Sequence, residues 1–549
     1  MNYTLSLSRH AAETLRAHLL GDRSREQMAI TLCGVNRLHH ELRLLVRDVI
    51  LLPPDAFHQQ TATYLELKPE VQSFIHQRAH RHGLIQVDWH SHPGQGHLLA
   101  FSPIDDRHEA AQAAYLVRRM DGVPYGSVLV SDEALDARLW LTPTHKRQDD
   151  DGRPKTTFDR PQSHPMHSIL TGDLTRRAPL SVQRLSRAAS KTGSQPDRVD
   201  LSTIFDRQVR AFGPDLQHTL NALRVGVIGL GGLGSALVDH LARLGVRDWV
   251  LVDPDVVELS NLNRLVSATL TDAQKARPKV NVARSIARQP NPQAHVQTLQ
   301  VDVFDPQAVH ALKACDLLIA ATDNHASRML LNRLAAQYLI PLLHVGFHIG
   351  VGSDGQIEDV SGEFALPDLG CWCLHCAGII DPQQAGWELA PLHQREALRQ
   401  RGYVTGVPAP AVRHLDGIVA SLAAAEVHNL AHPFKPLQRY LTYDAIGRTT
   451  SGRPELMSLQ VSARSDCPVC SADDGVLGLG DLEPLPSYRR SSQVQLPSAD
   501  LLQSLASVTD RREQVPAALV TGQESEPPDR AARVRRLQAA MEEADTAGR

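Results

Sequence analysis

The feature that most constrains the fold is the stretch RVGVIGLGGLGSALVDHLARLGV at residues 224–246. An apolar run, a cluster of glycines and apolar residues at helical spacing follow one another, which predicts strand, tight turn and helix. Gly229, Gly231 and Gly234 fit the pattern G-x-G-x-x-G, and Gly232 lies in the same turn. Glycine permits this turn, and backbone N–H groups at a helix start attract phosphate. We therefore predict an α/β fold with a doubly wound parallel sheet that binds a nucleotide at this turn.

The glycine turn alone does not identify the nucleotide. Asp253 ends the next predicted strand, DWVLVD, where a carboxylate can bind ribose hydroxyls. The same pattern is typical of NAD-dependent oxidoreductases, so this different class of enzyme stays open as an alternative. It predicts a nicotinamide-dependent absorbance change and no release of pyrophosphate.

Length and composition predict several domains. A chain of 549 residues is too long for one hydrophobic core. Residues 1–142 read as a compact α/β domain, and the polar segment 143–196 reads as a linker. Residues 197–480 alternate strand and helix, whereas residues 481–549 read as a mostly disordered tail.

Charge and hydropathy patterns limit the possible cellular locations and binding partners of the protein. The formal net charge of −4 gives no electrostatic reason to expect binding to nucleic acid or to membranes. No apolar run approaches membrane-spanning length, and the first residues lack a signal-peptide pattern. We therefore expect a cytoplasmic protein.

A second informative stretch is DWHSHPGQGHLLAFSPID at residues 88–105. His90 and His92 are two residues apart on a predicted strand, so both can face one metal ion, and Asp105 can supply an oxygen. Two imidazoles and one carboxylate leave one position of a tetrahedral zinc ion open for water, as in catalytic sites. Such chemistry also needs a general base, for which Glu26 is the best candidate.

The string His-Ser-His-Pro…Ser-Pro-Ile-Asp resembles the JAMM motif of the JAB/MPN metalloproteases, which reads Glu…His-x-His-Pro…Ser-x-x-Asp. The resemblance implies that His90, His92 and Asp105 bind zinc, that Glu26 activates water and that Ser102 stabilises the tetrahedral intermediate. It also implies a JAB/MPN α/β fold for the first domain.

Two spacings depart from the commonest JAMM pattern. The interval between His92 and Asp105 is longer, as a loop insertion would make it, and Glu26 lies one residue further from Gly34. Glu41 and Glu66 are therefore kept as weaker alternatives for the general base.

Three strings follow the glycine turn in a fixed order: DPDVVELSNLNRL, ARPKVNVA and LIAATDNHASR. Over residues 200–475 this order resembles the ThiF/MoeB/ubiquitin-activating enzyme superfamily. The resemblance implies adenylation of the C-terminal glycine of a ubiquitin-like, β-grasp protein by Mg-ATP. It also argues against the oxidoreductase alternative.

The resemblance assigns a role to each matching residue of the ATP site. Arg264 and Lys279 would contact the phosphates, which suits a reaction in which negative charge builds on them. Asn261 matches the asparagine of S-N-L-N-R, Asp323 matches the Mg²⁺ ligand and Asp253 matches the ribose ligand.

The string IFDRQVRAFG resembles the N-terminal helix of this superfamily. In that helix an arginine reaches the ATP of the neighbouring subunit, and Arg207 occupies its position. The resemblance therefore implies a homodimer.

The seven cysteines include two C-x-x-C pairs, Cys373 with Cys376 and Cys467 with Cys470. Two such pairs fit a tetrahedral zinc site with four thiolates. Similar pairs hold a structural zinc in ThiF/MoeB-like proteins. Cys371 is a spare sulfur near the first pair.

The segment RQRGYVTGVPAPAV contains no cysteine, although ThiF/MoeB-like chains often carry one before GVxAP. Cys315 is expected to pack in the core. We infer that the acyl-adenylate passes directly to an external nucleophile, such as the cysteine of a conjugating enzyme, a sulfur donor or an amine.

The two resemblances together suggest activation and hydrolysis at one C-terminal glycine, by trimming of a precursor or by deconjugation. Activation of a sulfur-carrier protein for cofactor or sulfur metabolism is the nearest alternative. A third alternative is a binding scaffold with inactive sites, which would bind neither zinc nor ATP.

Overall fold

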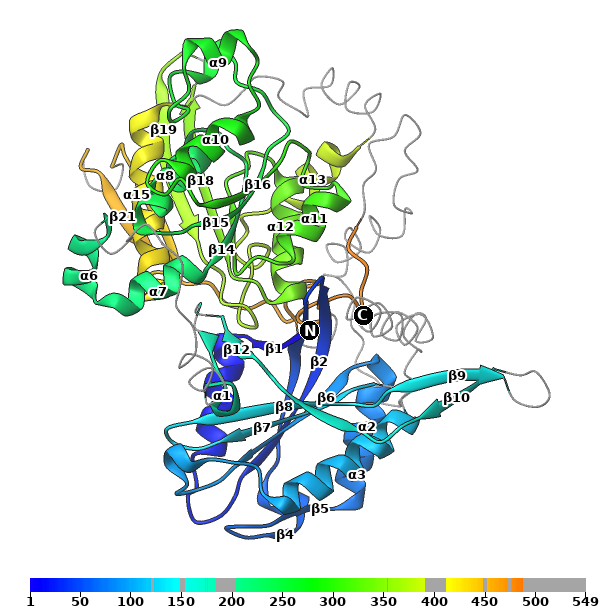
Figure 1. Cartoon of the computed structure of the whole chain (residues 1–549). Coiled ribbons are helices and arrows are strands. Elements are labelled where there is room, and N and C mark those ends of the chain that lie inside the picture. The colour runs from blue at the N-terminus through cyan, green and yellow to red at the C-terminus, as the bar shows by residue number, and fades with distance from the viewer. Residues whose placement is uncertain are drawn as a thin grey trace, which may run out of the picture.

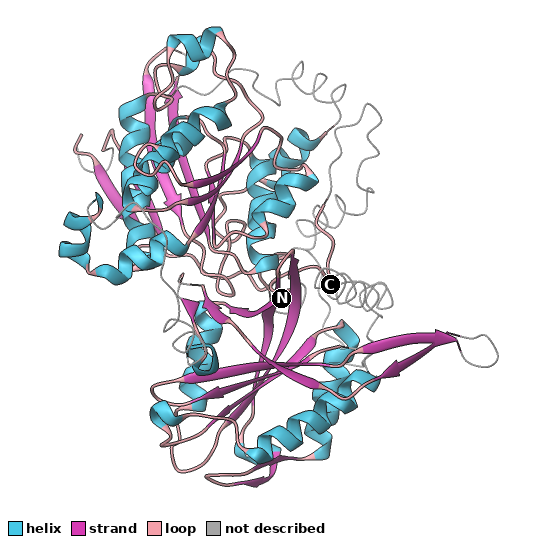
Figure 2. Cartoon of the chain, viewed as in Figure 1, coloured by secondary structure: helices cyan, strands magenta, loops and turns pink. Residues whose placement is uncertain are grey.

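The computed structural model describes residues 1–119, 123–148, 154–172, 174, 176–183, 204–352, 354–390, 411–447, 452–471 and 475–486. These residues form two α/β bodies, each built on its own sheet (Figure 1). Helices cover the faces of both sheets (Figure 2). None of the helices in the described part of the chain combines the length and the apolarity that a membrane span requires.

The first sheet is mixed and contains nine strands among the described residues. In sheet order they are β11 (Gln162–Pro165), β8 (Leu135–Leu141), β7 (Tyr125–Val130), β6 (Ile85–Ser91), β2 (Met28–Leu38), β3 (Glu41–Leu51), β1 (Asn2–Leu7), β12 (Ser168–Thr171) and β13 (Arg176–Arg177). Two hairpins stand apart from it: β4 (Phe57–Gln60) with β5 (Leu65–Leu67), and β9 (Thr144–Gln148) with β10 (Pro154–Phe158).

Three helices pack on this sheet. They are α1 (Arg9–Leu19), α2 (Pro69–His82) and α3 (Pro103–Arg119), and short turns of 3-10 helix occur at η1 (Pro54–Ala56) and η2 (Gly96–Leu98). The sequence marks their ends: the Ser8 side chain accepts a hydrogen bond from the N–H of Ala11, and Gly83 ends α2 with φ +63°. The helix α1 packs against β2 and β3, whereas α3 packs against β7 and β8.

The segment predicted as a linker, 143–196, is partly ordered, so this expectation was wrong for its first half. The strand β11 pairs with β8, and β12 pairs with β1, so the segment supplies strands at both edges of the first sheet. Strands of four residues among polar neighbours are too short to show clear alternation, which explains the error. Residues 184–203 lie outside the described part.

The second sheet contains eight described strands. In sheet order they are β16 (His295–Leu299), β15 (Asp248–Val252), β14 (Arg224–Ile228), β17 (Leu317–Ala320), β18 (Leu342–Val351), β19 (Ile357–Ala365), β20 (Tyr440–Asp444) and β21 (Glu455–Ser458). The first five pair in parallel and the last three add antiparallel strands. The predicted parallel α/β sheet is confirmed.

Helices lie on both faces of the second sheet (Figure 1). They are α6 (Asp206–Phe212), α7 (Pro214–Ala222), α8 (Gly232–Leu244), η3 (Leu259–Asn261), α9 (Leu270–Gln274), α10 (Lys279–Arg288), α11 (Pro306–Leu312), α12 (His325–Tyr338), α13 (Pro382–Leu389) and α15 (Arg413–Ala431). One face carries α8, α10 and α15, and the other carries α11, α12 and α13. The core therefore lies in two apolar layers, one on each side of the sheet.

A short segment near the described C-terminal end, residues 475–483, connects the two bodies. Val476, Leu479 and Leu482 are buried in the core of the first body. The backbone N–H of Gly478 meanwhile donates to the carbonyl of Ala336 on α12 of the second body. We call residues 475–483 the strap. Its last residues fall in the predicted tail 481–549, so the start of that segment is ordered; residues 487–549 lie outside the described part.

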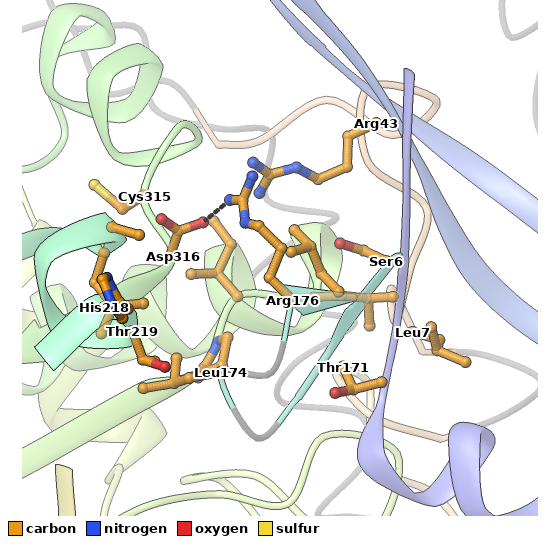
Figure 3. A pocket seen from close by; sticks show the side chains of 16 residues that line it. Ser6, Leu7, Arg43, Thr171, Leu174, Arg176, His218, Thr219, Cys315 and Asp316 are labelled. Carbon is orange, nitrogen blue, oxygen red and sulfur yellow. Dashed lines mark hydrogen bonds and ion pairs between the residues drawn. The ribbon is translucent and has the colours of Figure 1, made fainter. Parts of the chain in front are cut away.

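A cavity of about 260 Å³ lies between the two bodies (Figure 3). Arg43 and Arg176 line it from the first body, and His218 and Asp316 line it from the second. The Nη2 atom of Arg176 donates to Oδ1 of Asp316 at 3.0 Å, so an ion pair crosses the boundary.

Candidate functional site

The two predicted metal-binding histidines lie at the C-terminal end of β6. All seven residues of this strand are buried, because β2 and β7 flank it on both sides. His90 is in the strand and His92 follows it directly. Their Nε2 atoms lie 3.5 Å and 3.8 Å from the two carboxylate oxygens of Asp105. The structure thus brings the three predicted ligands together.

Asp105 is held by the start of α3. The N–H of Ser102 donates to Oδ2 of Asp105 at 2.6 Å, and the N–H of Asp105 donates to Oγ of Ser102 at 3.2 Å. This reciprocal pairing satisfies N–H groups of the first helical turn and fixes the carboxylate. Burial by itself would raise the pKa of Asp105, but the adjacent His90 imidazole and hydrogen bonds from Ser102 outweigh burial and lower the pKa. The carboxylate is therefore kept in the form that binds a cation.

Glu26 precedes β2 and is buried. Its Oε1 atom lies 3.5 Å from Nε2 of His92. Burial raises the pKa of Glu26 to about 7, a value suited to a general base near neutral pH. Of the two alternatives, Glu41 bonds Arg43 on β3, and Glu66 lies on the β4–β5 hairpin. The geometry therefore favours Glu26.

The ligand atoms of His90, His92 and Asp105 all lie within 4.8 Å of one another. Burial lowers the pKa of His92, which favours the neutral imidazole that binds metals. Two histidines and one carboxylate in this arrangement fit a zinc ion with an open position.

The predicted nucleotide turn joins β14 to α8. Gly229 has φ +85°, and a Cβ at Gly234 would lie 1.9 Å from the carbonyl oxygen of Gly229. Gly231 precedes the first residue of α8, Gly232. The glycines thus allow a sharp turn that presents the N-terminal end of a helix, as phosphate binding requires.

Residues that follow three adjacent parallel strands meet at this turn. The glycine turn follows β14, Asp253 follows β15 and Asp323 follows β17 shortly after the strand ends. Because β15, β14 and β17 are neighbours, their carboxyl ends form one edge of the sheet, where ligands of such folds bind. The Oδ2 atom of Asp253 accepts a hydrogen bond of 2.6 Å from the N–H of Leu230. Asp253 thereby also holds the glycine turn in shape.

The remaining predicted phosphate contacts lie close to the same edge. Lys279 is the first residue of α10, and its Nζ lies 2.9 Å from Oδ2 of Asp255. Asn261 is buried in η3 and accepts a hydrogen bond from the N–H of Glu258. A Cβ built on Gly232 would lie 3.4 Å from Cβ of Arg264, so that arginine borders the turn.

The four cysteines of the two C-x-x-C pairs form one cluster. The Sγ atom of Cys373 lies 3.6 Å from that of Cys467, and the Sγ of Cys376 lies 3.5 Å from that of Cys470. Tetrahedral zinc with Zn–S bonds of about 2.3 Å places its sulfurs about 3.8 Å apart. The cluster fits a structural zinc ion. Cys371 is half-buried and is not one of the four.

Comparison with known proteins identifies both bodies. Residues 205–469 match the ThiF family, and residues 8–141 match the family of prokaryotic homologs of the JAB domain. The SAMP-activating enzyme E1 of Haloferax volcanii is 38% identical over 303 residues, which cover 54% of this chain and 97% of that protein. The chain belongs to the ThiF family, fused to a JAB domain.

Other similar proteins match the same part of the chain. The molybdopterin-synthase adenylyltransferase of Escherichia coli K12 is 29% identical over 270 residues, 48% of this chain and 95% of that protein. A crystal structure of E. coli MccB with ATP is 18% identical, has a TM-score of 0.38 and covers 53% of this chain and 81% of that chain.

Two side chains of the ThiF-family domain join the site although the sequence patterns did not assign them a role. Arg328 on α12 is mostly buried, and its guanidinium donates to the carbonyl of Thr322, next to Asp323. Asp416 on α15 is buried against the glycine turn, where a Cβ at Gly232 would lie 2.0 Å from its Oδ2. Arg328 follows the TDN string by one helical turn, so its position in the sequence could have placed it near the site. Asp416 is distant in sequence from the other site residues, and no pattern indicated its position.

Arg207 is not brought to the glycine turn of its own chain. It is exposed on α6, and its neighbour Gln208 bonds the carbonyl of Arg243 at the C-terminal end of α8. That helix has 13 residues and therefore separates Arg207 from the turn by about 20 Å. The predicted role toward a neighbouring subunit stays a prediction.

Two of the three cysteines outside the cluster, Cys33 and Cys315, are not prepared for catalysis. Cys315 is buried at the start of β17, as expected, and burial raises the pKa of its thiol. Burial also raises the pKa of Cys33 to about 12. Both thiols are therefore poor nucleophiles. Most of the crossover segment without a cysteine, up to residue 410, lies outside the described part.

Proposed function

We propose that the ThiF-family domain adenylates the C-terminal glycine of a ubiquitin-like protein and that the JAB domain is a zinc protease or isopeptidase acting on the same C-terminus. The observation that carries the proposal is the occurrence of both residue sets in one chain. The glycine turn, Asp253 and Asp323 share one sheet edge, while His90 and Asp105 belong to a metal-type cluster in the fused domain.

Adenylation forms a bond between the terminal carboxylate of the protein and the α-phosphorus of ATP, and it breaks the bond to pyrophosphate. Arg264 and Lys279 would balance the charge that develops on the phosphates. Lys279 now pairs with Asp255, so it would exchange that carboxylate for a phosphate. Asp323 would hold Mg²⁺, which would supply positive charge against the phosphate oxygens.

Hydrolysis in the JAB domain would add water to the carbonyl carbon of the glycine and release an amine. Zinc held by His90, His92 and Asp105 supplies Lewis acidity. Glu26 would take a proton from the attacking water and return it to the departing nitrogen. Ser102 would stabilise charge on the tetrahedral carbonyl oxygen. Its hydroxyl accepts a hydrogen bond from the N–H of Asp105, which holds the side chain beside the metal cluster.

The fate of the adenylate distinguishes two versions of the function. Relatives include an enzyme named for SAMP activation and others named as molybdopterin-synthase and sulfur-carrier adenylyltransferases. The first version yields a conjugate, through a conjugating enzyme or an amine, and the second yields a thiocarboxylate, through a sulfur donor. We favour conjugation because a fused hydrolase gives a means of reversing it.

The test of activation is ATP–pyrophosphate exchange with small β-grasp proteins that end in diglycine. Exchange should require the diglycine tail and should fall at least 100-fold in Asp323→Ala. Asp354→Ala, in an exposed loop, is the matched control. The product mass then separates thiocarboxylate from conjugate. Absence of exchange with every such protein would refute the adenylation proposal.

The test of hydrolysis uses zinc-loaded protein and a diglycine isopeptide. Glu26→Gln should lower kcat by at least 100-fold while the zinc content stays equal to that of the wild type. Loss of zinc together with activity would instead make Glu26 a metal ligand, and cleavage that survives the substitution would refute its role as base.

A further inference from the structure

The cleft that contains His90 and Asp105 extends well beyond the metal ligands. Its volume is about 450 Å³, and its lining comes from α2, α3 and the β4–β5 hairpin together with β2, β6 and β7. The metal cluster therefore occupies only one part of a larger groove, and the remainder is available to a substrate.

Apart from His76, His90 and His108, the charged side chains of this lining are all acidic. Among the described residues that border the cleft, five carry a carboxyl group and none is lysine or arginine; the acids are Glu26, Glu66, Asp88, Asp105 and Glu109. Such a cleft between low-dielectric walls concentrates cations. Asp105 lies against His90 and His92. Glu109 accepts a hydrogen bond of 2.7 Å from Arg138, which lies behind the lining.

Asp88 differs from those two acids because its hydrogen-bond donors are neutral. Its carboxylate accepts a hydrogen bond of 2.8 Å from the hydroxyl of Tyr125 and one of 2.7 Å from the amide of Gln86. Asp88 is only 8% exposed. A buried carboxylate is costly unless hydrogen bonds or a cation offset the lost hydration, so this position suits a positively charged group of a ligand.

Gln86 offers a second acceptor in the same direction. Residues 86, 88 and 90 alternate along β6 and face the same side, toward the cleft. Gln86 is 3% exposed, and its Oε1 atom has no hydrogen-bond partner. An unsatisfied buried acceptor next to a carboxylate suits a ligand with several N–H donors.

We propose that Gln86 and Asp88 form a subsite for a lysine or arginine side chain of the substrate. Asp88 lies about 7 Å along the strand from His90. That distance matches the reach, on the order of 6 Å, of the four-carbon stem of lysine. The inference rests on the hydrolase activity proposed for the JAB domain and gives it a specificity: a basic residue next to the scissile bond.

The test compares peptides that differ only in charge, on the zinc-loaded full chain. One series carries lysine after the scissile bond of a diglycine, and the other carries lysine before the diglycine. Each peptide has a norleucine counterpart of similar length without the charge. We expect at least a 10-fold higher kcat/KM for lysine in one series, which also shows on which side of the bond the subsite acts.

Variants connect the preference to the subsite. Asp88→Asn should abolish the ratio between lysine and norleucine peptides, and Gln86→Glu should increase it. Glu70→Gln removes an exposed acid of α2 outside the cleft and should leave the ratio unchanged. Equal kcat/KM for both peptides in both series, or a ratio that survives Asp88→Asn, would overturn the proposal.

A binding measurement separates this inference from the hydrolase proposal. If no peptide is cleaved, the hydrolase activity fails, and the same labelled peptides are then titrated onto zinc-loaded Glu26→Gln protein by fluorescence anisotropy. Tighter binding of lysine peptides that disappears with Asp88→Asn supports the subsite. Equal binding of lysine and norleucine peptides refutes it.

Discussion

The hydroxyl of Tyr338 donates a hydrogen bond of 2.8 Å to Oδ1 of Asp481, which lies in the strap. The same carboxylate accepts a hydrogen bond of 2.8 Å from the N–H of Arg37 on β2 and forms an ion pair with Lys313. One side chain therefore bonds to both the JAB domain and the ThiF-family domain. The strap also follows Cys470 closely, so the zinc cluster and the domain boundary are neighbours in the chain.

We predict that Asp481→Ala weakens the contact between the domains. Three donors lose their shared acceptor, and unsatisfied buried donors cost about 1–3 kcal/mol each. Hydrogen exchange in residues 475–483 should accelerate, and the two domains should unfold at separate temperatures. Asp354→Ala, in an exposed loop, is the control and should change neither measurement. Unchanged exchange in Asp481→Ala would show that the apolar residues of the strap suffice.

We predict that the chain binds one zinc ion at each of its two clusters. Cys470→Ser should remove the ion of the four-cysteine cluster and lower the melting temperature, because structural zinc contributes folding free energy. His90→Ala should remove the other ion with little effect on that temperature. Cys371→Ser is the control and should keep both ions. Mass spectrometry measures the zinc content of each variant, and loss of zinc from Cys371→Ser would contradict the assignment of the four ligands.

A pair of alanine substitutions tests the glycine turn. A Cβ at Gly234 would lie 1.9 Å from the carbonyl oxygen of Gly229, whereas a Cβ at Gly231 has nothing within 4 Å. Gly234→Ala should therefore destabilise the domain by about 1–3 kcal/mol, the usual cost of overpacking, and weaken ATP binding. Gly231→Ala should leave the free energy of unfolding nearly unchanged. Denaturant titration measures both, and equal stability of the two variants would contradict the turn geometry.

Asp416 gives a prediction about pH. Burial raises the pKa of Asp416 from 3.8 to about 6, although Arg264 and Arg413 oppose the shift. As pH rises from about 4 to 6, the unfolded chain releases this proton before the folded chain does, so Asp416 lowers stability over that window.

Asp416→Asn removes this titration while keeping the shape. The variant should gain stability relative to wild type as pH rises through the window, reaching about 1–2 kcal/mol above pH 6 once solvent screening is allowed for. Thermal unfolding between pH 4 and pH 8 measures the difference. A stability difference that does not depend on pH would show that Asp416 titrates normally.

Local patterns predicted much of the site because the chemistry is concentrated in short strings. His90 and His92 are two residues apart, and each C-x-x-C pair is local, so spacing alone indicated metal ligands. The short strands β11 and β12 were missed, because four residues carry too little periodicity to distinguish a strand from a linker. The strand β11 forms its hydrogen bonds with β8, and β12 forms its hydrogen bonds with β1, which lies at the opposite end of the domain in sequence.

The sequence by itself determined which residues have the right chemistry: the histidines and aspartate of the metal cluster, the glycines of the turn and the four cysteines. Only the tertiary structure decided that Glu26 rather than Glu41 meets His92 and that Asp416 packs against Gly232. It also decided that the strap joins both domains. The reason is physical: spacing within one strand or turn is set by local backbone geometry, whereas contacts between distant segments depend on how the whole core packs.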